Sequence, residues 1–287
     1  MTSPTAEPAV RTYPTVSGPV SAALVLPGSK SLTNRALPLA AVAGGTSTLR
    51  GVLDSDDSRA MVEALGALGF AVDARWDAHV ARVEGSGGRV PSGAADVNCG
   101  EGATVARFLL AICAAGRGTY RFDGGPSLRR RPLAPLLRAL GELGAEIDAT
   151  GAGTLPLTLR ARGLRGGAVE LDSSGSSQYL SALLLAAPLG ERAAEITTAV
   201  TVSEPYVDLT LGLLADFGVS VGGSAAGGRF VVPAPQAYRA ADLTIEADAS
   251  TASYFFAAAA VTGGRVTVRN LSRRRCRQGD ARFLDVL

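Results

Sequence analysis

Apolar residues recur with helical spacing in several stretches that end at a glycine and continue into a short alternating run. The phrases ALGALGFAVDA, ALGELGAEIDA and LLADFGVSV share this order, with the glycine at Gly69, Gly144 and Gly218. Spacing of three and four residues predicts an amphipathic helix, and alternation predicts a half-buried strand. A glycine just past a helix accepts the left-handed backbone that ends it. The pattern therefore predicts three equivalent helix-to-strand junctions.

These junctions are evenly spaced, because 75 residues separate Gly69 from Gly144 and 74 separate Gly144 from Gly218. A second series runs in step, and each of its members reads as a polar turn, a helix of small residues, a glycine-rich exit and a strand. The repeating unit is thus strand, helix, strand, helix, then strands, which predicts an α/β protein. The members of the second series are residues 29–49, 101–122, 173–196 and 248–268.

A fourth unit begins but does not finish within the chain. Its first helix is expected at 251–261 and a second one near Ala281, while the next glycine of the series would fall near position 292, beyond Leu287. An unfinished unit leaves an apolar helix face and strand edges without partners. We therefore expect three complete units, most of a fourth, and a natural protein whose C-terminal part is absent from this chain.

Composition narrows the class of protein. The chain has 287 residues, is 47% hydrophobic and carries a formal charge of +2, which gives no general basis for binding nucleic acid or a membrane surface. Its apolar runs are shorter than the roughly 20 residues that span a bilayer. The opening MTSPTAEPAVRTYPT has no apolar core of a signal peptide. These features predict a cytoplasmic protein that binds neither nucleic acid nor membrane.

Cysteine and histidine usage gives no indication of a metal site. Cys99, Cys113 and Cys276 form no CxxC pair, and an odd number of cysteines in a chain of this length favours reduced thiols. His79 is the single histidine, which excludes a cluster of histidine ligands and favours a solvent-exposed side chain. We therefore expect no metal site built from clustered histidines or paired cysteines.

The first polar turn has the composition of an anion site. Gly28, Ser29, Lys30 and Ser31 lie between an expected strand and a helix start, where free backbone N–H groups and the helix dipole favour a negative charge. Arg35 follows about one helical turn later and could offer a planar fork to a carboxylate or phosphate. A capped helix with two surface cations explains the same spacing equally well. A P-loop fits less well, because the order is GSKS rather than GKS.

The corresponding turns of the other units carry similar groups. At one helix start, Ser176, Ser177 and Gln178 present two hydroxyls and an amide. At the corresponding start in the second unit, Thr104 and Arg107 present a hydroxyl and a guanidinium. Because repeated units place equivalent turns at the same end, we predict one convergent anion site.

Two further positions allow both a structural and a functional reading. Ser203 precedes Pro205 and could simply cap a helix, a role worth about 1 kcal/mol. Arg131 is expected to open the helix RPLAPLLRALGELG. Runs such as Arg129–Arg131 are usually solvated, so at most one of the three is expected to bind a ligand.

Four stretches carry a resemblance to a known family. PGSKSLTNRALPLAA resembles the opening signature of 5-enolpyruvylshikimate-3-phosphate synthases, and SSQYLSALLLAAP, VSEPYVDLT and DASTASYFFAAAAVTGG resemble later stretches of that family in the right order. The resemblance begins near residue 12. It implies two inside-out α/β domains of three units each that close over the substrates. Residues 21–241 would be the complete three-unit domain that binds shikimate-3-phosphate, and 1–20 with 242–287 would be an incomplete part of the other.

The resemblance also implies a reaction and its partners. Members transfer the enolpyruvyl group of phosphoenolpyruvate to the 5-hydroxyl of shikimate-3-phosphate and release phosphate, in the shikimate pathway to chorismate and the aromatic amino acids. No cofactor is implied, and the complete protein is expected to be a monomer. Lys30 would act in catalysis and touch both substrates. Shikimate-3-phosphate would be held by Lys30, Ser31, Arg35, Ser176, Ser177, Gln178 and Ser203, and phosphoenolpyruvate by Lys30, Ala103, Thr104, Arg131 and Gln178.

The chain departs from the family in two respects. The phosphoenolpyruvate loop usually reads NAGT, whereas here Glu101 and Ala103 replace the asparagine and the glycine. A carboxylate beside an anion site is unfavourable unless it points away or pairs with Arg107. The family's acid and base carboxylates lie beyond the point matching Leu287, so we expect the fragment to be inactive alone. A non-catalytic, degenerate copy remains an alternative, and a UDP-N-acetylglucosamine enolpyruvyl transferase is a more distant one, since its loop cysteine would fall at Pro126.

Overall fold

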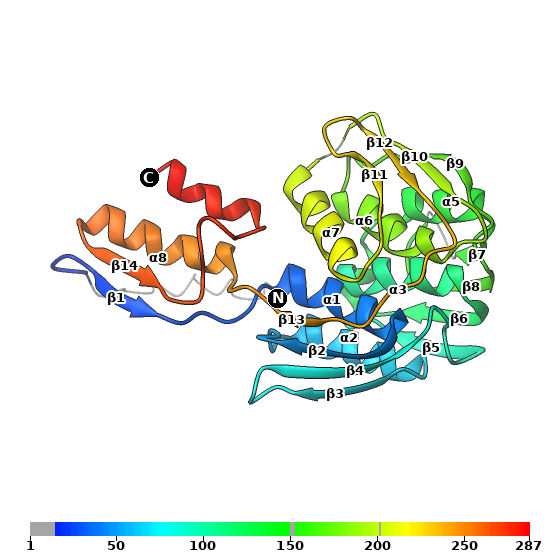
Figure 1. The fold of residues 1–287 in the computed structure, drawn as a ribbon, viewed down its shortest axis with the longest axis horizontal. Helices are drawn as coiled ribbons and strands as arrows, with labels where there is room; N and C mark the ends of the chain where they lie inside the picture. The colour runs from blue at the N-terminus through cyan, green and yellow to red at the C-terminus, as the bar shows by residue number, and fades with distance from the viewer. Residues whose placement is uncertain (1–14, 150–152, 201) are drawn as a thin grey trace, which may run out of the picture.

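The computed structural model of the chain describes residues 15–149, 153–200 and 202–287. Most of the opening segment discussed above, residues 1–14, lies outside the described residues. Helices and strands alternate through the chain, which confirms the predicted α/β class. Most of the described chain forms one large body, and a smaller unit lies beside it (Figure 1).

Three helices lie at the centre of the large body and are buried on nearly every side. Beyond their first two turns, which carry polar and aromatic residues, they are small or aliphatic all round, as expected for helices with no solvent-facing stripe. A second set of three helices is only partly buried and carries more polar residues. The central helices are α1 (Lys30–Val42), α3 (Ala103–Ala115) and α6 (Ser177–Ala186); the others are α2 (Asp56–Ala67), α5 (Ala134–Glu142) and α7 (Glu204–Asp216).

Three four-stranded sheets surround these helices, so the sheets are outside and the helices inside (Figure 1). Every sheet has the same plan, in which the first two strands pair in parallel and the other pairs are antiparallel. The first sheet has the order β13 (Asp242–Thr244), β2 (Gly44–Arg50), β4 (Val80–Ser86), β3 (Ala71–Arg75). The second is β5 (Ala94–Asn98), β6 (Arg117–Asp123), β8 (Leu157–Arg162), β7 (Glu146–Ala149). The third is β9 (Gly167–Glu170), β10 (Ala194–Thr197), β12 (Arg229–Val232), β11 (Gly222–Ser224).

The three glycines of the repeat end the three outer helices, as predicted. Gly69, Gly144 and Gly218 follow α2, α5 and α7 with φ of 86°, 115° and 79°. In each case the next residue donates its backbone N–H to a carbonyl in the last helical turn; Phe70, for example, donates to Leu65 at 3.0 Å. This 6→1 bond satisfies a carbonyl that the helix end leaves open.

The smaller unit joins two segments that are far apart in sequence. Strand β1 (Ser21–Leu24) pairs in parallel with β14 (Arg265–Val268), and α8 (Ala249–Thr262) precedes β14. The 3₁₀ segment η2 (Gly279–Asp285) contacts α8. A separate small core holds this unit together, formed by Leu26, Ala247, Ala252 and Val268.

Strand pairing moves both predicted boundaries of the three-unit domain. Residues 21–24 were expected in the first unit, but they form β1 and pair with β14 instead. Residues 242–244 were expected in the second domain, but they form β13 and supply the parallel edge strand next to β2. The chain therefore passes between the two parts near residues 25–29 and again near 245–248, and the first sheet is closed by a strand from the far end of the sequence.

Two shorter helices complete the described structure, α4 (Pro126–Arg129) and the 3₁₀ turn η1 (Ala187–Leu189). None of the helices in the described ranges has the length and apolar content needed to cross a membrane.

Candidate functional site

The first turns of four helices come together in the large body. Arg35, in the second turn of α1, bonds to Ser181 in the second turn of α6 and to Thr210 in the second turn of α7. Arg107, in the second turn of α3, bonds to Ser176 and Gln178 at the start of α6. These links require the N-terminal ends of α1, α3, α6 and α7 to lie at the same end of the bundle. Each such end presents unpaired N–H groups and a partial positive charge.

Lys30 is the first residue of α1 and remains accessible, with 54% of its side chain exposed. Its ammonium lies 3.3 Å from the Asp57 carboxylate at the start of α2. Its backbone N–H faces the carboxylate of Asp248, which caps α8. Ser29, which precedes it, makes no side-chain capping bond. Lys30 therefore lies where the large body meets the smaller unit. A more strongly charged anion could replace Asp57 as the partner of its ammonium.

Arg35 is enclosed rather than open to a ligand. It is 2% exposed, and its guanidinium donates to the Ser31 carbonyl at 2.9 Å, to Thr210 at 2.8 Å and to Ser181 at 3.4 Å. The aromatic ring of Phe108 lies 5.2 Å from its Cζ. Burial lowers the pKa of Arg35 to about 10, partly offset by Tyr206. In this structure Arg35 donates a hydrogen bond to the Ser31 carbonyl. A direct contact between Arg35 and the carboxylate of a bound substrate stays a prediction.

The start of α6 is tied to α3 through Arg107. Its Nη1 donates to the Gln178 Oε1 at 2.7 Å and to the Ser176 Oγ at 3.2 Å. Ser176 also caps α6 by accepting the Gln178 N–H at 3.3 Å. Ser177, the first helical residue, is 7% exposed. The structure thus brings Ser176, Ser177 and Gln178 together, as predicted from their adjacency. Arg107 donates hydrogen bonds to two of them, Ser176 and Gln178.

The segment around Arg131 is held by a short helix rather than by the long one predicted. Helix α5 begins at Ala134, and Arg131 instead follows α4, where its N–H donates to the Leu128 carbonyl at 2.9 Å. Its side chain is exposed. Arg129 is already engaged, because it forms a two-point bond to Asp123 at 2.8 and 2.7 Å that lowers the pKa of that carboxyl.

Glu101 points away from Arg107 and toward α4. Its Oε2 accepts the Leu128 N–H at 2.8 Å, and a Cβ placed on Gly125 would lie 2.0 Å from its Oε1. The missing side chain of Gly125 therefore gives the carboxylate access to this helix start. The acidic replacement in the loop is explained by a local role in ordering α4.

The remaining predicted residues lie at the starts of α3 and α7. Ala103 is the first residue of α3, is 8% exposed and is followed by the half-buried Thr104. Ser203 occupies the cap position of α7 but makes no capping bond with its side chain, so the predicted structural role is wrong. Its φ of 54° is in the left-handed region, which is uncommon outside glycine and concentrates at functional sites.

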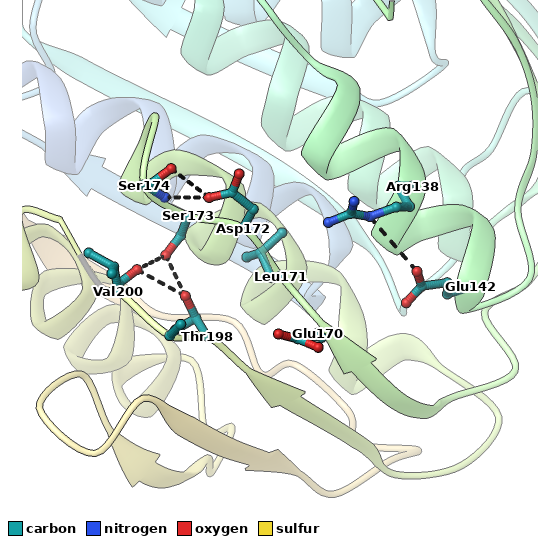
Figure 2. Close-up of a pocket in the computed structure, with 10 residues that line it drawn as sticks. Arg138, Glu142, Glu170, Leu171, Asp172, Ser173, Ser174, Thr198 and Val200 are labelled. Carbon is teal, nitrogen blue, oxygen red and sulfur yellow. Dashed lines mark hydrogen bonds and ion pairs between the residues drawn. The ribbon is translucent and has the colours of Figure 1, made fainter.

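A separate cavity of about 450 Å³ lies between α5 and the carboxyl ends of β9 and β10 (Figure 2). Arg138 and Glu142 border one side, and Asp172 and Ser174 are bonded to each other on the other. None of the predicted site residues lines it. No repeated motif marks this cavity in the sequence, because its residues come together only when the strands pair.

Comparisons with known proteins agree with this arrangement. A model of the EPSP synthase (3-phosphoshikimate 1-carboxyvinyltransferase) family matches residues 14–287. The chain is 44% identical over 276 residues to the 3-phosphoshikimate 1-carboxyvinyltransferase of Trichormus variabilis, and 42% identical over 279 residues to that of Ralstonia pickettii. These alignments cover 96% and 94% of this chain and 64% of each relative, so the chain spans about two thirds of their length.

A solved structure shows the same fold. EPSP synthase from Acinetobacter baumannii superposes with a TM-score of 0.79 at 25% identity, covering 88% of this chain and 56% of the other. The inside-out arrangement, the helix-start residues and the match over nearly the whole sequence lead to one conclusion. This chain belongs to the EPSP synthase family.

Proposed function

We propose that this chain contributes the shikimate-3-phosphate site to an enzyme that transfers the enolpyruvyl group of phosphoenolpyruvate to the 5-hydroxyl of that substrate. The observation that carries the proposal is the meeting of four helix N-termini, linked by Arg35 and Arg107, in a chain with the family's sequence. Helix starts and cations suit two phosphorylated substrates, because both are anions that must be held close together.

The body of three four-stranded sheets is the proposed binding part for shikimate-3-phosphate. Ser176, Ser177 and Ser203 would donate to its phosphate, and Ser31 with Arg35 would hold the ring and its carboxylate. This assignment is supported by the position of Ser176 and Ser177 at the start of α6 and by the Ser203 hydroxyl, which makes no capping bond to α7. Arg35 would need to turn from its present partners to reach a carboxylate directly.

Phosphoenolpyruvate would lie beside the start of α3, against Ala103 and Thr104, with Arg131 and Gln178 at its carboxylate or phosphate. Lys30 would contact both substrates after leaving Asp57. In the proposed reaction the 5-hydroxyl gives up its proton as its oxygen adds to C2 of phosphoenolpyruvate, and C3 gains a proton. Loss of that proton and of inorganic phosphate then regenerates the double bond. The residues described here would position the two anions and stabilise charge.

We further propose that the protein acts in the cytoplasm as a monomer on these small molecules. Cys99, Cys113 and Cys276 are free thiols, which supports a reducing compartment.

Titration calorimetry of the purified chain with shikimate-3-phosphate tests the proposal. Ser177→Ala should weaken binding about ten- to hundred-fold, the loss expected when one hydrogen bond to a charged group is removed. Ser174→Ala is the matched control, because Ser174 lies three residues earlier and bonds to Asp172. Equal affinities for Ser177→Ala and the unsubstituted chain would contradict the assignment, and so would the absence of any binding.

A further inference from the structure

Arg107 is a buried cation whose described partners are all uncharged. It is 6% exposed, and its two Nη atoms donate to hydroxyl, amide and carbonyl oxygens. Its Nε is buried and has no hydrogen-bond partner among the described residues. Burial lowers the pKa of Arg107, and the nearby charge of Arg131 lowers it further, whereas Tyr179 opposes the shift.

A buried guanidinium with uncharged partners is expected to stabilise the fold less than an apolar side chain of similar volume would. Burial of a charge costs several kcal/mol, and an apolar side chain of similar volume is often at least as stable. The Tyr179 hydroxyl already satisfies the Pro132 carbonyl, with a bond of 2.7 Å. Packing therefore does not account for a guanidinium at this position, and its hydrogen bonds to the start of α6 deserve a functional explanation.

The direction of those hydrogen bonds determines whether Ser176 and Gln178 act as donors or acceptors toward a bound molecule. A guanidinium only donates hydrogen bonds, so the atom of Gln178 that meets Nη1 must be the carbonyl oxygen. The amide NH₂ of Gln178 is then turned elsewhere as a donor. Ser176 Oγ likewise accepts from Arg107 and from the Gln178 N–H, so its own proton is left to donate.

We propose that Arg107 is a positioning residue that makes Ser176 and Gln178 donors toward a bound phosphorylated anion. The inference rests on the proposed function and deepens it, because it explains how neutral side chains are committed to anion binding. The second Nη contacts the Pro132 carbonyl at 3.3 Å and so ties the segment that follows Arg131 to the same guanidinium. A planar fork can reach both sides at once, whereas the single nitrogen of a lysine cannot.

The test compares Arg107→Met and Arg107→Lys with the unsubstituted chain by titration calorimetry with shikimate-3-phosphate, alongside thermal melting. Arg107→Met should bind about ten- to hundred-fold more weakly while its melting temperature is unchanged or higher. Arg107→Lys should recover part of the affinity, since it can still donate to Gln178. Arg162→Met, at an exposed arginine that pairs with Glu146, is the control and should bind normally.

Gln178→Glu supplies a second and independent readout. A carboxylate there would form an ion pair with Arg107 and stabilise the fold, but it would have no NH₂ to donate and would repel the anion. We expect a higher melting temperature together with a loss of binding of more than a hundred-fold.

The outcomes separate the two levels of the argument. Normal affinity in Arg107→Met, or a loss that follows a lower melting temperature in both Arg107 variants, would overturn the positioning role while the site itself stands. If the unsubstituted chain binds no shikimate-3-phosphate, the proposed function fails, and the positioning role fails with it.

Discussion

Replacing Arg35 by methionine should stabilise the fold while removing a group that the proposed site needs. Arg35 has no carboxylate among its described hydrogen-bond partners, and the groups it would leave can satisfy one another. Ser181 and Thr210 are already 2.9 Å apart, and Thr210 donates to the Tyr206 carbonyl at 2.8 Å. Methionine fills most of the same volume, so the substitution should leave neither a cavity nor a buried hydroxyl without a partner.

The magnitude follows from the pKa of Arg35, which burial lowers from the ordinary value of an arginine to about 10. This difference corresponds to about 3 kcal/mol of destabilisation of the charged form. Between pH 10 and the higher pKa of an exposed arginine, the unfolded chain binds more protons than the folded one, so stability rises with pH across that window. Below pH 10 the full penalty is present. Loss of the three hydrogen bonds and of the ring contact with Phe108 offsets part of the gain, leaving about 1–2 kcal/mol at neutral pH.

Urea unfolding at pH 7, followed by circular dichroism, measures this difference directly. Arg35→Met should unfold at a higher midpoint with an unchanged slope, and its melting temperature should rise by about 2–4 °C per kcal/mol. Arg162→Met, at an exposed position, should change neither quantity. A lower midpoint for Arg35→Met would refute the reasoning, because it would show that the hydrogen bonds and ring contact outweigh the desolvation of the charge.

Three further predictions concern local features. Gly69→Ala should destabilise the chain by about 1–2 kcal/mol, because φ is 86° at this position. Gly66→Ala should stabilise it by about 0.5–1 kcal/mol, because Gly66 lies inside α2 with open space where a Cβ would be. The urea midpoints of the two variants compare these effects. Glu101→Ala should cost about 1 kcal/mol by leaving the Leu128 N–H without its acceptor, and Glu101→Gln should restore most of it in the same assay. At pH 8 a thiol reagent should label Cys276 slowly, since burial raises its pKa to about 12. The reagent should reach the buried Cys99 and Cys113 only after unfolding. Counting the labelled thiols with and without urea checks both expectations.

The parts of the fold that could be predicted are those written in neighbouring residues. The glycines at 69, 144 and 218 mark helix ends because the left-handed backbone is a local requirement, and the spacing of apolar residues marks the helices before them. The pairing of Ser21 with Arg265 could not be predicted in this way. Parallel strands need a long connection, and nothing in either strand specifies a partner more than 200 residues away. The boundary predicted at residue 21 could not take this pairing into account.

The candidate site shows the same division. Residues adjacent in sequence, such as Ser176, Ser177 and Gln178, were predicted together and lie together. The spacing of Arg35 fitted either a ligand-binding fork or a surface cation, and Arg107 was predicted to present its side chain at a helix start. The structure buries both. Burial depends on how closely α6 and α7 approach, which is a property of packing and not of the motif. Sequence therefore predicted which neighbouring residues lie together at a helix start better than it predicted what each one contacts.

The three central helices show how a repeated unit can diverge to make one asymmetric site. Arg35, Arg107 and Ser181 occupy the second turns of α1, α3 and α6, so two units carry an arginine where the third carries a serine. Both arginines donate to α6, one to Ser181 and the other to residues at its first turn. A third arginine in α6 would bring another buried cation against the first and would remove the acceptor that Arg35 uses, at a cost of several kcal/mol. The small hydroxyl in the third unit is thus what lets two equivalent cations support one helix start, and it is this start that carries the neutral donors proposed to bind the phosphate.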